Sequence, residues 1–468
     1  MTPAATDHAP LYPPTVPPVT QPRHLIFGIA GIVQNPIRVY PEQLYTDEIV
    51  PRTFFGSSLV WVTSPRLVEQ ILLTDTALFA KSPWETRVLG PMLGNGVLTA
   101  MGPSWRWQRK ATAPLFRHTD VLAYVPRIVD AAETQLAHWR LRQRQHPSTP
   151  VLADVEMAMR DATFDVIAST ILAGITAEEA QTVKHNDHAY ISRITWEFAA
   201  IVLRLPPWVW HPAKAQMKAA ATKLRATMEA IVSRRRAEIE AGSRADDVVG
   251  RLLAARHPET GEAMPVEMIV NNLATFLEAG HQTTAQALTW TLYLLARAPH
   301  WQERLRNEAR AVAGDGPVLP EHIERLSETA RVFKESMRLY PPVATIVRIA
   351  TADTELAGQP VRKGSVVIIP LFALHRHRAK WVDPDRFDPD RFLPEREARF
   401  ERGQYAPFGF GPRTCLGMPL AMVEGLAILA TLLRRARFEW DGRHLPEPVS
   451  AIVLRPKGGM PLKVSMLP

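Results

Sequence analysis

Cysteine is almost absent from the chain, because its 468 residues include a single one, Cys415. One thiol cannot form an internal disulfide, and it cannot supply the several Cys and His ligands that a structural zinc site needs. Three roles remain: a buried inert thiol, a nucleophile, or the one thiolate ligand of a metal cofactor. The count alone favours the inert thiol, so the residues around Cys415 must decide.

An apolar run long enough to span a membrane is also missing. The apolar stretch LIFGIAGIV (25–33) is far shorter than the roughly 20 residues of a membrane-spanning helix. It has no basic region before it and no small-residue cleavage site, which excludes a secretory signal. The many prolines of residues 1–23 predict a flexible N-terminal arm, followed by one domain over residues 24–468. We expect a soluble, cytoplasmic protein without a transmembrane segment, where an unpaired thiol is stable.

Neither a strong charge excess nor a dinucleotide fingerprint is present. Lys and Arg number 55 against 47 Asp and Glu, and the two signs alternate along most of the chain. This pattern favours solvated helix faces over a nucleic-acid site, with a surface for an acidic protein partner as the alternative. Gly409 and Gly411 lack the third glycine and the preceding strand of a nucleotide-binding loop. An oxidoreductase with this sequence must therefore receive electrons from another protein.

Between about residues 100 and 340, most of the chain has the periodic spacing of apolar residues that is typical of α-helices. Residues 54–63 and 354–370 instead show the glycine turns and β-branched alternation of strands and a hairpin. There is no βαβ alternation, internal repeat or clear linker. The sequence thus predicts a mostly α single domain with a minor β region.

Cys415 lies in the stretch FGFGPRTCLG (408–417), directly before a long apolar helical run. A helix start offers unpaired N–H groups and a positive dipole end, which predicts a lowered thiol pKa. Gly409 and Gly417 allow a tight turn and the close approach of a flat group, and Phe408 can shield the sulfur. A haem iron needs such a thiolate as its axial ligand. A nucleophile would need a general base, and no histidine lies close in sequence.

This stretch resembles the haem-binding loop of the cytochrome P-450 family, F-x-x-G-x-[RH]-x-C-x-G. The matching positions are Phe408, Gly411, Arg413, Cys415 and Gly417. The resemblance implies a triangular, mostly α single domain of the soluble bacterial type. It implies heme b between the Cys415 loop and a long oxygen-binding helix. It also implies a haem–thiolate monooxygenase that inserts one oxygen atom from O2 into an organic substrate.

Three further residues, together with Arg413 of the same loop, match the family's haem-propionate partners: Trp105, Arg109 and Arg348. Trp105 and Arg109 are four residues apart in GPSWRWQRKATAPLF, so they share one face of a helix. Two carboxylates in a partly buried pocket require cations that can bind them in a bidentate way.

A second part of the resemblance is a Glu–Arg–Arg triad. Glu335 and Arg338 form E-x-x-R in KESMRLYPP, and Arg391 in WVDPDRFDPDRF matches the third member. Arg386 occupies the first PDRF repeat and is the less favoured candidate. Because a buried triad costs desolvation energy, we expect it to be retained for the specific conformation of the loop rather than for raw stability, which is a scaffold role and not a catalytic one.

The segment TFLEAGHQTTAQALTW (275–290) resembles the family's oxygen-binding helix, [AG]-G-x-[DE]-T-[TS]. Ala279, Gly280 and Thr283 share one helical face, where small groups would leave room for dioxygen and the Thr283 hydroxyl would relay protons. Gln282 stands where the family has an acid, and an amide can position water but cannot act as an acid. We therefore expect Thr283 and water to deliver protons, with Gln282 placing the water. The alternative is a helix-packing role for Gly280 and a back-bonded surface Thr283.

The remaining candidates concern neighbouring histidines and the substrate. His281, and the pair His375 and His377, are expected to be structural, because a short His-x-His without carboxylates is a weak metal motif. By family analogy the substrate contacts apolar residues, which predicts an apolar fatty acyl, terpenoid or steroid-like substrate. These residues are Ala279, Val343, Ala344, Ile346, Ile452 and Val453.

The electron donor is expected to be an acidic ferredoxin, served by a ferredoxin reductase. Arg106, Lys110 and Arg117 lie on or just after the helix that carries Arg109 and would form its docking surface. Three alternatives stay open. They are a haem–thiolate peroxygenase or isomerase without an electron partner, a non-catalytic haem sensor, and a nucleophilic cysteine enzyme.

Overall fold

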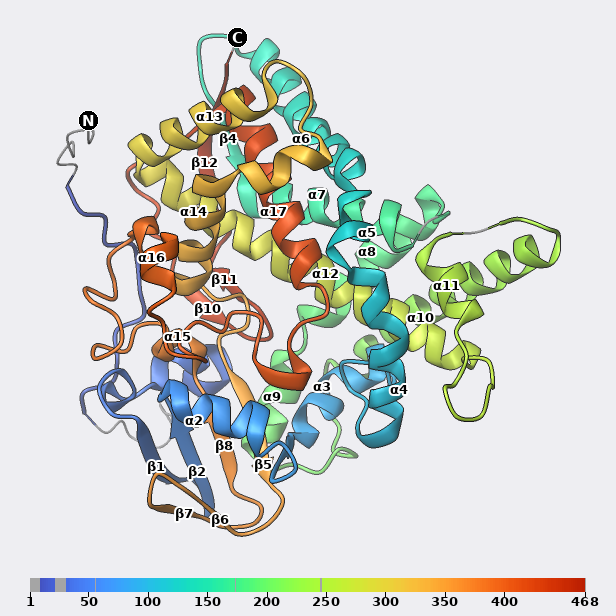
Figure 1. Cartoon of the computed structure of the whole chain (residues 1–468), viewed down its shortest axis with the longest axis vertical. Helices are drawn as coiled ribbons and strands as arrows, with labels where there is room; N and C mark the ends of the chain where they lie inside the picture. The colour runs from blue at the N-terminus through green and yellow to red at the C-terminus, as the bar shows by residue number, and fades with distance from the viewer. Residues whose placement is uncertain (1–8, 22–30, 55, 173, 245, 468) are drawn as a thin grey trace.

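A long helix, α12 (Val266–Arg297), runs through the middle of the molecule (Figure 1). Apolar side chains point from nearly all of its sides, so other helices cover it, among them α7 (Val155–Thr170) and α17 (Met418–Arg435). The computed structural model describes residues 9–21, 31–54, 56–172, 174–244 and 246–467. The other α-helices are α2 (Pro65–Glu69), α3 (Pro83–Leu93), α4 (Gly102–Thr112), α5 (His118–Leu122), α6 (Val125–Gln145), α8 (Ala177–Ile191), α9 (Thr195–Val202), α10 (Lys214–Glu240), α11 (Val248–Ala254), α13 (Pro299–Ala313), α14 (Ser327–Leu339), α15 (Leu371–Leu374) and α16 (Pro394–Glu397).

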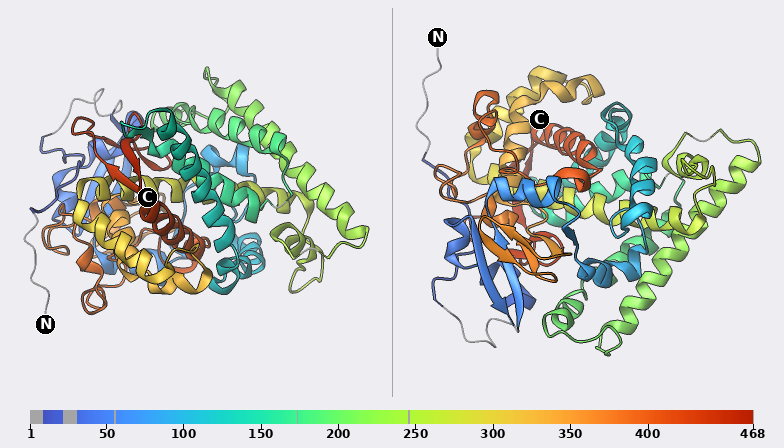
Figure 2. Two further views of the ribbon diagram at one scale, coloured as in Figure 1. Left: turned by 90° about the horizontal axis from the view of Figure 1, so that it is seen from above. Right: turned by 60° about the horizontal axis from the view of Figure 1, so that its bottom comes forward.

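The main β-sheet lies at one corner of the molecule, and both views in Figure 2 show α10 and α11 standing away from it. Its strand order is β1-β2-β8-β5-β3, and only the β2–β8 pair is parallel. A second sheet has the order β4-β12-β9, and the described residues also form the two-stranded pairs β10-β11 and β6-β7. The strands are β1 (Ile49–Phe54), β2 (Ser57–Val62), β3 (Phe79–Lys81), β4 (Val151–Asp154), β5 (Ile346–Ala350), β6 (Thr354–Leu356), β7 (Gln359–Val361), β8 (Val366–Ile369), β9 (Ala436–Glu439), β10 (Pro448–Ser450), β11 (Leu454–Pro456) and β12 (Pro461–Met466).

Two apolar cores support this architecture. The larger one gathers the helices around α12, and the smaller one lies under the main sheet, where Val60, Val62 and Ile369 are buried. Strand residues with alternate side chains on this buried face explain the β-branched pattern of the sequence. The mostly α fold with a minor β region is therefore as predicted.

The described part of the N-terminal segment, residues 9–21, corrects the prediction of a flexible arm. Val16 is buried, and the carbonyl groups of Leu11 and Pro14 accept hydrogen bonds from the Phe387 N–H (2.9 Å) and the Tyr340 hydroxyl (2.6 Å). A proline-rich extended chain has no internal hydrogen bonds, so its carbonyl groups are free to bind the body of the protein. The predicted boundary at residues 23 and 24, and most of the apolar stretch 25–33, lie outside the described residues.

In the described part of the chain, no helix combines the length and the apolar character needed to cross a membrane.

Candidate functional site

A cavity of about 1440 Å³ lies between α12 and the loop 408–417, and we call it the central cavity. Its lining is mostly apolar, and the sulfur-bearing residue Cys415 is part of the wall. The volume exceeds the roughly 300–1000 Å³ of an ordinary small-molecule site. The cavity is therefore large enough for a flat cofactor together with a substrate.

Cys415 is held by its backbone immediately before α17. Its N–H donates to the Phe408 carbonyl (2.9 Å), and its sulfur accepts from the backbone N–H groups of Gly417 and Met418. Burial nevertheless raises the pKa of the thiol, although these N–H groups and nearby Arg109 act in the opposite direction. The Cys415 side chain is exposed toward the central cavity, so the surrounding cavity wall, and not close packing on the sulfur, raises the pKa against the predicted lowering. A metal ion bound to the sulfur displaces the proton in either case.

The structure explains why residue 411 is a glycine, which the sequence alone did not reveal. Its φ is +72°, and a Cβ atom there would lie 1.9 Å from the carbonyl oxygen of Leu72. The glycine thus lets the Cys415 loop pack on the turn Gln70–Thr74. Gly409, in contrast, lines the central cavity. A Cβ atom at this position would meet no close neighbour, because the nearest atom, Ile346 Cδ1, would lie 3.9 Å away.

Three arginines line the central cavity near Cys415: Arg109, Arg348 and Arg413. The Arg109 Nη1 donates to the Thr414 carbonyl at 2.7 Å, and the Arg413 guanidinium stacks 3.9 Å above the Trp105 ring. Burial lowers the pKa of each arginine. For Arg413 the neighbouring charges of Arg348 and Arg109 add to burial, and its pKa falls to about 10.

This group of cations calls for an anionic ligand. Arg413 Nη1 is buried and has no acceptor among the described residues. Glu85 is the acid whose charge acts on both Arg348 and Arg413. Two carboxylates of a bound cofactor would satisfy these guanidinium groups, which bind carboxylates in a bidentate way. The two propionates of a haem, together with an iron facing Cys415, fit this set of residues.

The comparison with known proteins agrees with this donor set. The model of the family described as Cytochrome P450 matches residues 17–463. The chain belongs to the cytochrome P450 family. It is 30% identical over 420 residues to cytokinin hydroxylase of Arabidopsis thaliana, covering 87% of this chain and 78% of that protein. It is also 30% identical to cyclooctat-9-en-7-ol 5-monooxygenase of Streptomyces melanosporofaciens, covering 82% of this chain and 80% of that protein.

The fold agrees as well. The crystal structure of the cytochrome P450DA heme domain superimposes with a TM-score of 0.81 at 23% identity, covering 97% of this chain and 99% of that one. The chain is thus a cytochrome P450 monooxygenase that takes a haem and receives electrons from an external redox partner. When bound, the haem supplies the activation of dioxygen. Cys415 would hold its iron, and Arg109, Arg348, Arg413 and Trp105 would hold its propionates.

On α12, Ala279, Gly280 and Thr283 line the central cavity of this cytochrome P450, as predicted. The Thr283 hydroxyl donates to the Ala279 carbonyl at 2.7 Å, so it is both back-bonded and part of the wall. At Gly280, an added Cβ would lie 2.6 Å from Ile167 Cδ1 of α7. Close packing of α7 on α12 therefore accounts for this glycine, which was the alternative explanation.

Gln282 does not line the cavity, which corrects its expected role in positioning water beside Thr283. Its amide Nε2 donates to Asp187 Oδ2 of α8 at 3.0 Å. One residue along a helix turns the side chain by about 100°, so residue 282 faces α8 when residue 283 faces the cavity. His281 also lies on this side, where its Nδ1 donates to the Leu277 carbonyl at 2.8 Å, in agreement with a structural role.

Two buried acids in the cavity wall were missed, Glu278 and Glu424. Burial raises the pKa of both far above the ordinary value, and the charge of Asp187 adds to the effect at Glu278. A sequence signal existed, because each acid interrupts an otherwise apolar helical run. The wall is therefore not purely apolar.

The predicted contacts Ala279, Val343, Ala344, Ile346, Ile452 and Val453 do line the cavity.

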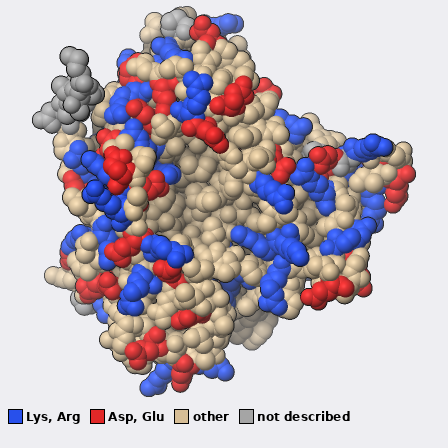
Figure 3. Space-filling model, in the orientation of Figure 1, with Lys and Arg blue, Asp and Glu red and all other residues tan. Residues whose placement is uncertain are grey.

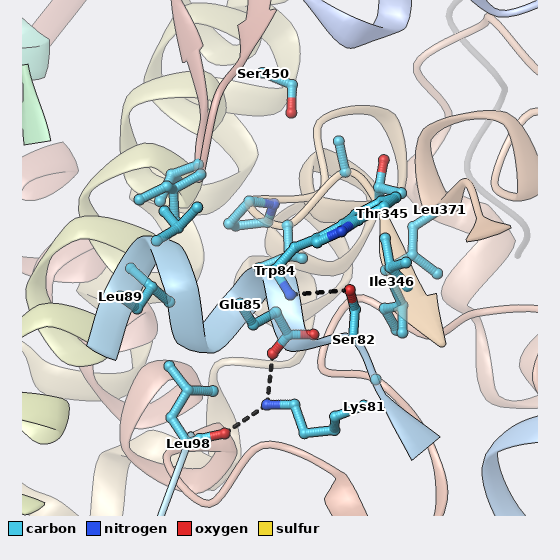
Figure 4. A pocket seen from close by; sticks show the side chains of 18 of the residues that line it. Lys81, Ser82, Trp84, Glu85, Leu89, Leu98, Thr345, Ile346, Leu371 and Ser450 are labelled. Atoms are coloured by element: carbon cyan, nitrogen blue, oxygen red, sulfur yellow. Dashed lines mark hydrogen bonds and ion pairs between the residues drawn. The ribbon is translucent and has the colours of Figure 1, made fainter. Parts of the chain in front are cut away.

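Lys81 and Glu85 form a charged pair in the same wall (Figure 4). The Lys81 Nζ lies 2.5 Å from Glu85 Oε2 and donates to the Leu98 carbonyl at 2.5 Å. Burial lowers the pKa of Lys81, which Glu85 counteracts. Sequence reasoning missed this pair, although Lys81 and Glu85 have the i,i+4 spacing of helix neighbours.

The predicted triad is assembled away from the cavity. Arg338 donates to Glu335 from Nε (2.6 Å) and Nη2 (2.8 Å), and the Arg391 Nε lies 3.5 Å from Glu335 Oε1. Arg386 contributes its main-chain carbonyl to Arg338 and is not the third member. His375 lies beside them, where its Nε2 accepts the Ala406 N–H at 3.0 Å.

Proposed function

We propose that this cytochrome P450 binds heme b and hydroxylates an apolar compound of terpenoid size, with electrons from an acidic ferredoxin and its reductase. One observation carries the proposal. The central cavity joins a thiol, a cluster of buried and partly buried arginines and a large, mostly apolar wall in one space. Fatty acyl and steroid-like substrates share this apolar chemistry. Two relatives from Streptomyces melanosporofaciens, named cyclooctat-9-en-7-ol 5-monooxygenase and cyclooctatin synthase, favour the terpenoid class.

The residues of the chain have separate tasks in this proposal. Val343, Ala344 and Ile346 would hold the substrate against the cofactor by apolar contact. Thr283 would hold a hydroxyl at the cavity wall, where it can hold a proton or pass it on once it turns from the Ala279 carbonyl. Exclusion of water by the apolar wall would keep that proton from being lost to solvent.

The proposal is tested by incubating the holoprotein with a terpenoid, a ferredoxin system and isotopically heavy dioxygen. A monooxygenase product carries one heavy oxygen atom per turnover. Product formed from hydrogen peroxide alone, and none with the ferredoxin system, would instead identify a peroxygenase. Substrate binding without product under either condition would identify a haem sensor.

Thr283→Ala is expected to lower the product formed per reductant consumed by roughly tenfold, because one hydrogen-bonding hydroxyl is worth about 1.4 kcal/mol. Electrons would still be consumed, and more of them would appear as hydrogen peroxide. The measurement is the ratio of product and peroxide to reductant with one confirmed substrate. Thr283→Ser keeps the hydroxyl and should stay coupled. Full coupling in Thr283→Ala would remove the proton role from this residue.

The electron donor is expected to dock on the face that carries Arg106, Lys110 and Arg117. All three side chains are exposed, and Lys and Arg gather on this side of the molecule around α4 (Figure 3). α4 also carries Arg109, so the surface lies close to the thiol side of the cavity. Arg106→Glu with Lys110→Glu should slow reduction by an acidic ferredoxin roughly tenfold or more at low salt, because charge steers the encounter.

Reduction rates from stopped-flow mixing give the measurement. The matched control is Lys218→Glu with Arg236→Glu, two exposed basic residues of α10, which changes the net charge by the same amount. High salt should slow the wild-type protein toward the rate of the α4 variant. Equal slowing by both double variants would show that net charge alone matters, and would refute the docking surface.

A further inference from the structure

Glu278 is a buried acid in the wall of the central cavity that the proposed function leaves without a role. It lies on α12 directly before Ala279, and the residue is 6% exposed. An acid in a mostly apolar wall costs free energy unless its oxygen atoms are paired. The first question is therefore what the carboxyl group of Glu278 contacts.

Its partner is Asp187 on α8. The two carboxyl groups lie within hydrogen-bonding reach of each other, and each has one buried oxygen without an N–H or O–H donor among the described residues, Glu278 Oε2 and Asp187 Oδ1. Two ionised carboxylates only accept hydrogen bonds, so a pair in contact must share a proton. A single proton between them satisfies both of these oxygens.

The surroundings decide which acid keeps the proton. Asp187 Oδ2 accepts from Gln282 Nε2 at 3.0 Å, which favours its ionised form, and His281 Nε2 at 3.5 Å adds to this effect when the ring carries a proton on both nitrogens. Burial raises the pKa of Asp187, but hydrogen bonds from Glu278, His281 and Gln282 hold it well below the ordinary value. Burial and the charge of Asp187 raise the pKa of Glu278. Glu278 is therefore the neutral member, and its O–H points toward Asp187.

The free atom of Glu278 is then a carbonyl oxygen. One oxygen carries the O–H that Asp187 uses, so the other oxygen is left for the cavity that Glu278 lines. This oxygen can accept a hydrogen bond but has no proton to give. The geometry therefore makes Glu278 a recognition group rather than a competitor of Thr283 for proton delivery.

We propose that Glu278, positioned by Asp187, accepts a hydrogen bond from a hydroxyl group of the substrate. The site then selects apolar molecules that already carry one alcohol over hydrocarbons of the same skeleton. This inference deepens the proposed function and rests on it, because it takes the central cavity to be the substrate site. An apolar wall with one fixed polar atom also orients the molecule, since the alcohol can lie at a single place.

The test compares matched probes by isothermal titration calorimetry on the holoprotein: borneol with bornane, and cedrol with cedrane. In at least one pair the alcohol should bind roughly tenfold more tightly, the factor that one hydrogen bond supplies. Glu278→Leu should remove this preference. Glu278→Gln should keep it, because its amide can donate to Asp187 and still present a carbonyl oxygen.

Two further variants keep the result interpretable. Asp187→Asn with Glu278→Leu removes the buried charge as well, so it tests the same loss if Glu278→Leu alone does not fold. Glu424→Gln changes the other buried cavity acid and should leave the preference intact. Infrared difference spectra should show the C=O stretch of a protonated acid lost in Glu278→Gln.

Equal affinity within both pairs, no binding by either alcohol, or a preference that survives in Glu278→Leu would each overturn the inference. A missing carboxylic acid band would overturn the shared proton on which it depends. These readouts need no turnover. Failure of the proposed function would appear instead as an absence of oxidised product from a protein that still distinguishes alcohol from hydrocarbon.

Discussion

Cys415→Ser is expected to abolish the far red-shifted carbon-monoxide band of the reduced holoprotein. The band reports a thiolate on the iron, and the chain has no second cysteine to replace it. A serine hydroxyl reaches less far than a cysteine sulfur and is a far weaker electron donor than a thiolate. The loss should therefore be complete, and monooxygenase activity should disappear with it. The measurement is the difference spectrum of the reduced protein with and without carbon monoxide.

The control for this prediction is the neighbouring residue. Thr414→Ser keeps the hydroxyl that donates to the Gly411 carbonyl at 2.7 Å, and it leaves Cys415 unchanged. It should retain the band at full height. A red-shifted band in Cys415→Ser would mean that Cys415 is not the ligand and that the nucleophilic or inert-thiol alternatives must be considered again.

The Cys415 loop could be predicted because its geometry is local. Phe408, Gly411, Arg413 and Cys415 lie within one short turn before a helix, so their spacing in sequence nearly fixes their spacing in space. The thiol pKa could not be predicted in the same way. The helix start lowers it as expected, but how strongly burial raises it depends on all the elements that close the cavity.

The direction of side chains on α12 was harder to predict. Thr283 and Gln282 are adjacent, and a helical pattern does not say which of them meets the cavity until α8 is placed beside α12. The pairing of Glu278 with Asp187 depends on the same packing of two distant segments. The role of Gly280 depends on Ile167 of α7, which the sequence motif does not contain.

For the N-terminal segment, the sequence predicted the backbone conformation but not its contacts. Proline content predicts an extended backbone, and residues 9–21 are indeed free of helices and sheets of their own. Whether such a backbone stays free depends on donors elsewhere in the chain. Here the Tyr340 hydroxyl and the Phe387 N–H provide them, more than 300 residues away.

Glu335→Ala is expected to lower the free energy of unfolding by about 3–5 kcal/mol, the range for breaking a buried ion pair. Glu335 and Arg338 are fully buried, and the Arg391 side chain is 10% exposed. Glu335 also accepts the Asp388 N–H at 2.8 Å. Removing the carboxylate would leave two guanidinium groups without their counterion. The measurement is denaturant unfolding of the protein, followed together with haem retention.

The matched control is Arg386→Ala. This arginine occupies the first PDRF repeat and gives Arg338 only its main-chain carbonyl, which alanine retains. Its replacement should change stability by no more than roughly 0.5 kcal/mol. Equal unfolding midpoints for the two variants would refute the triad as a support of the fold.

Arg338 also donates to the carbonyl groups of His375 and Pro384, so loss of Glu335 should loosen the segment that leads to the Cys415 loop. Haem should then dissociate from Glu335→Ala at lower denaturant than the unfolding of its helices, whereas a purely local defect would release both together.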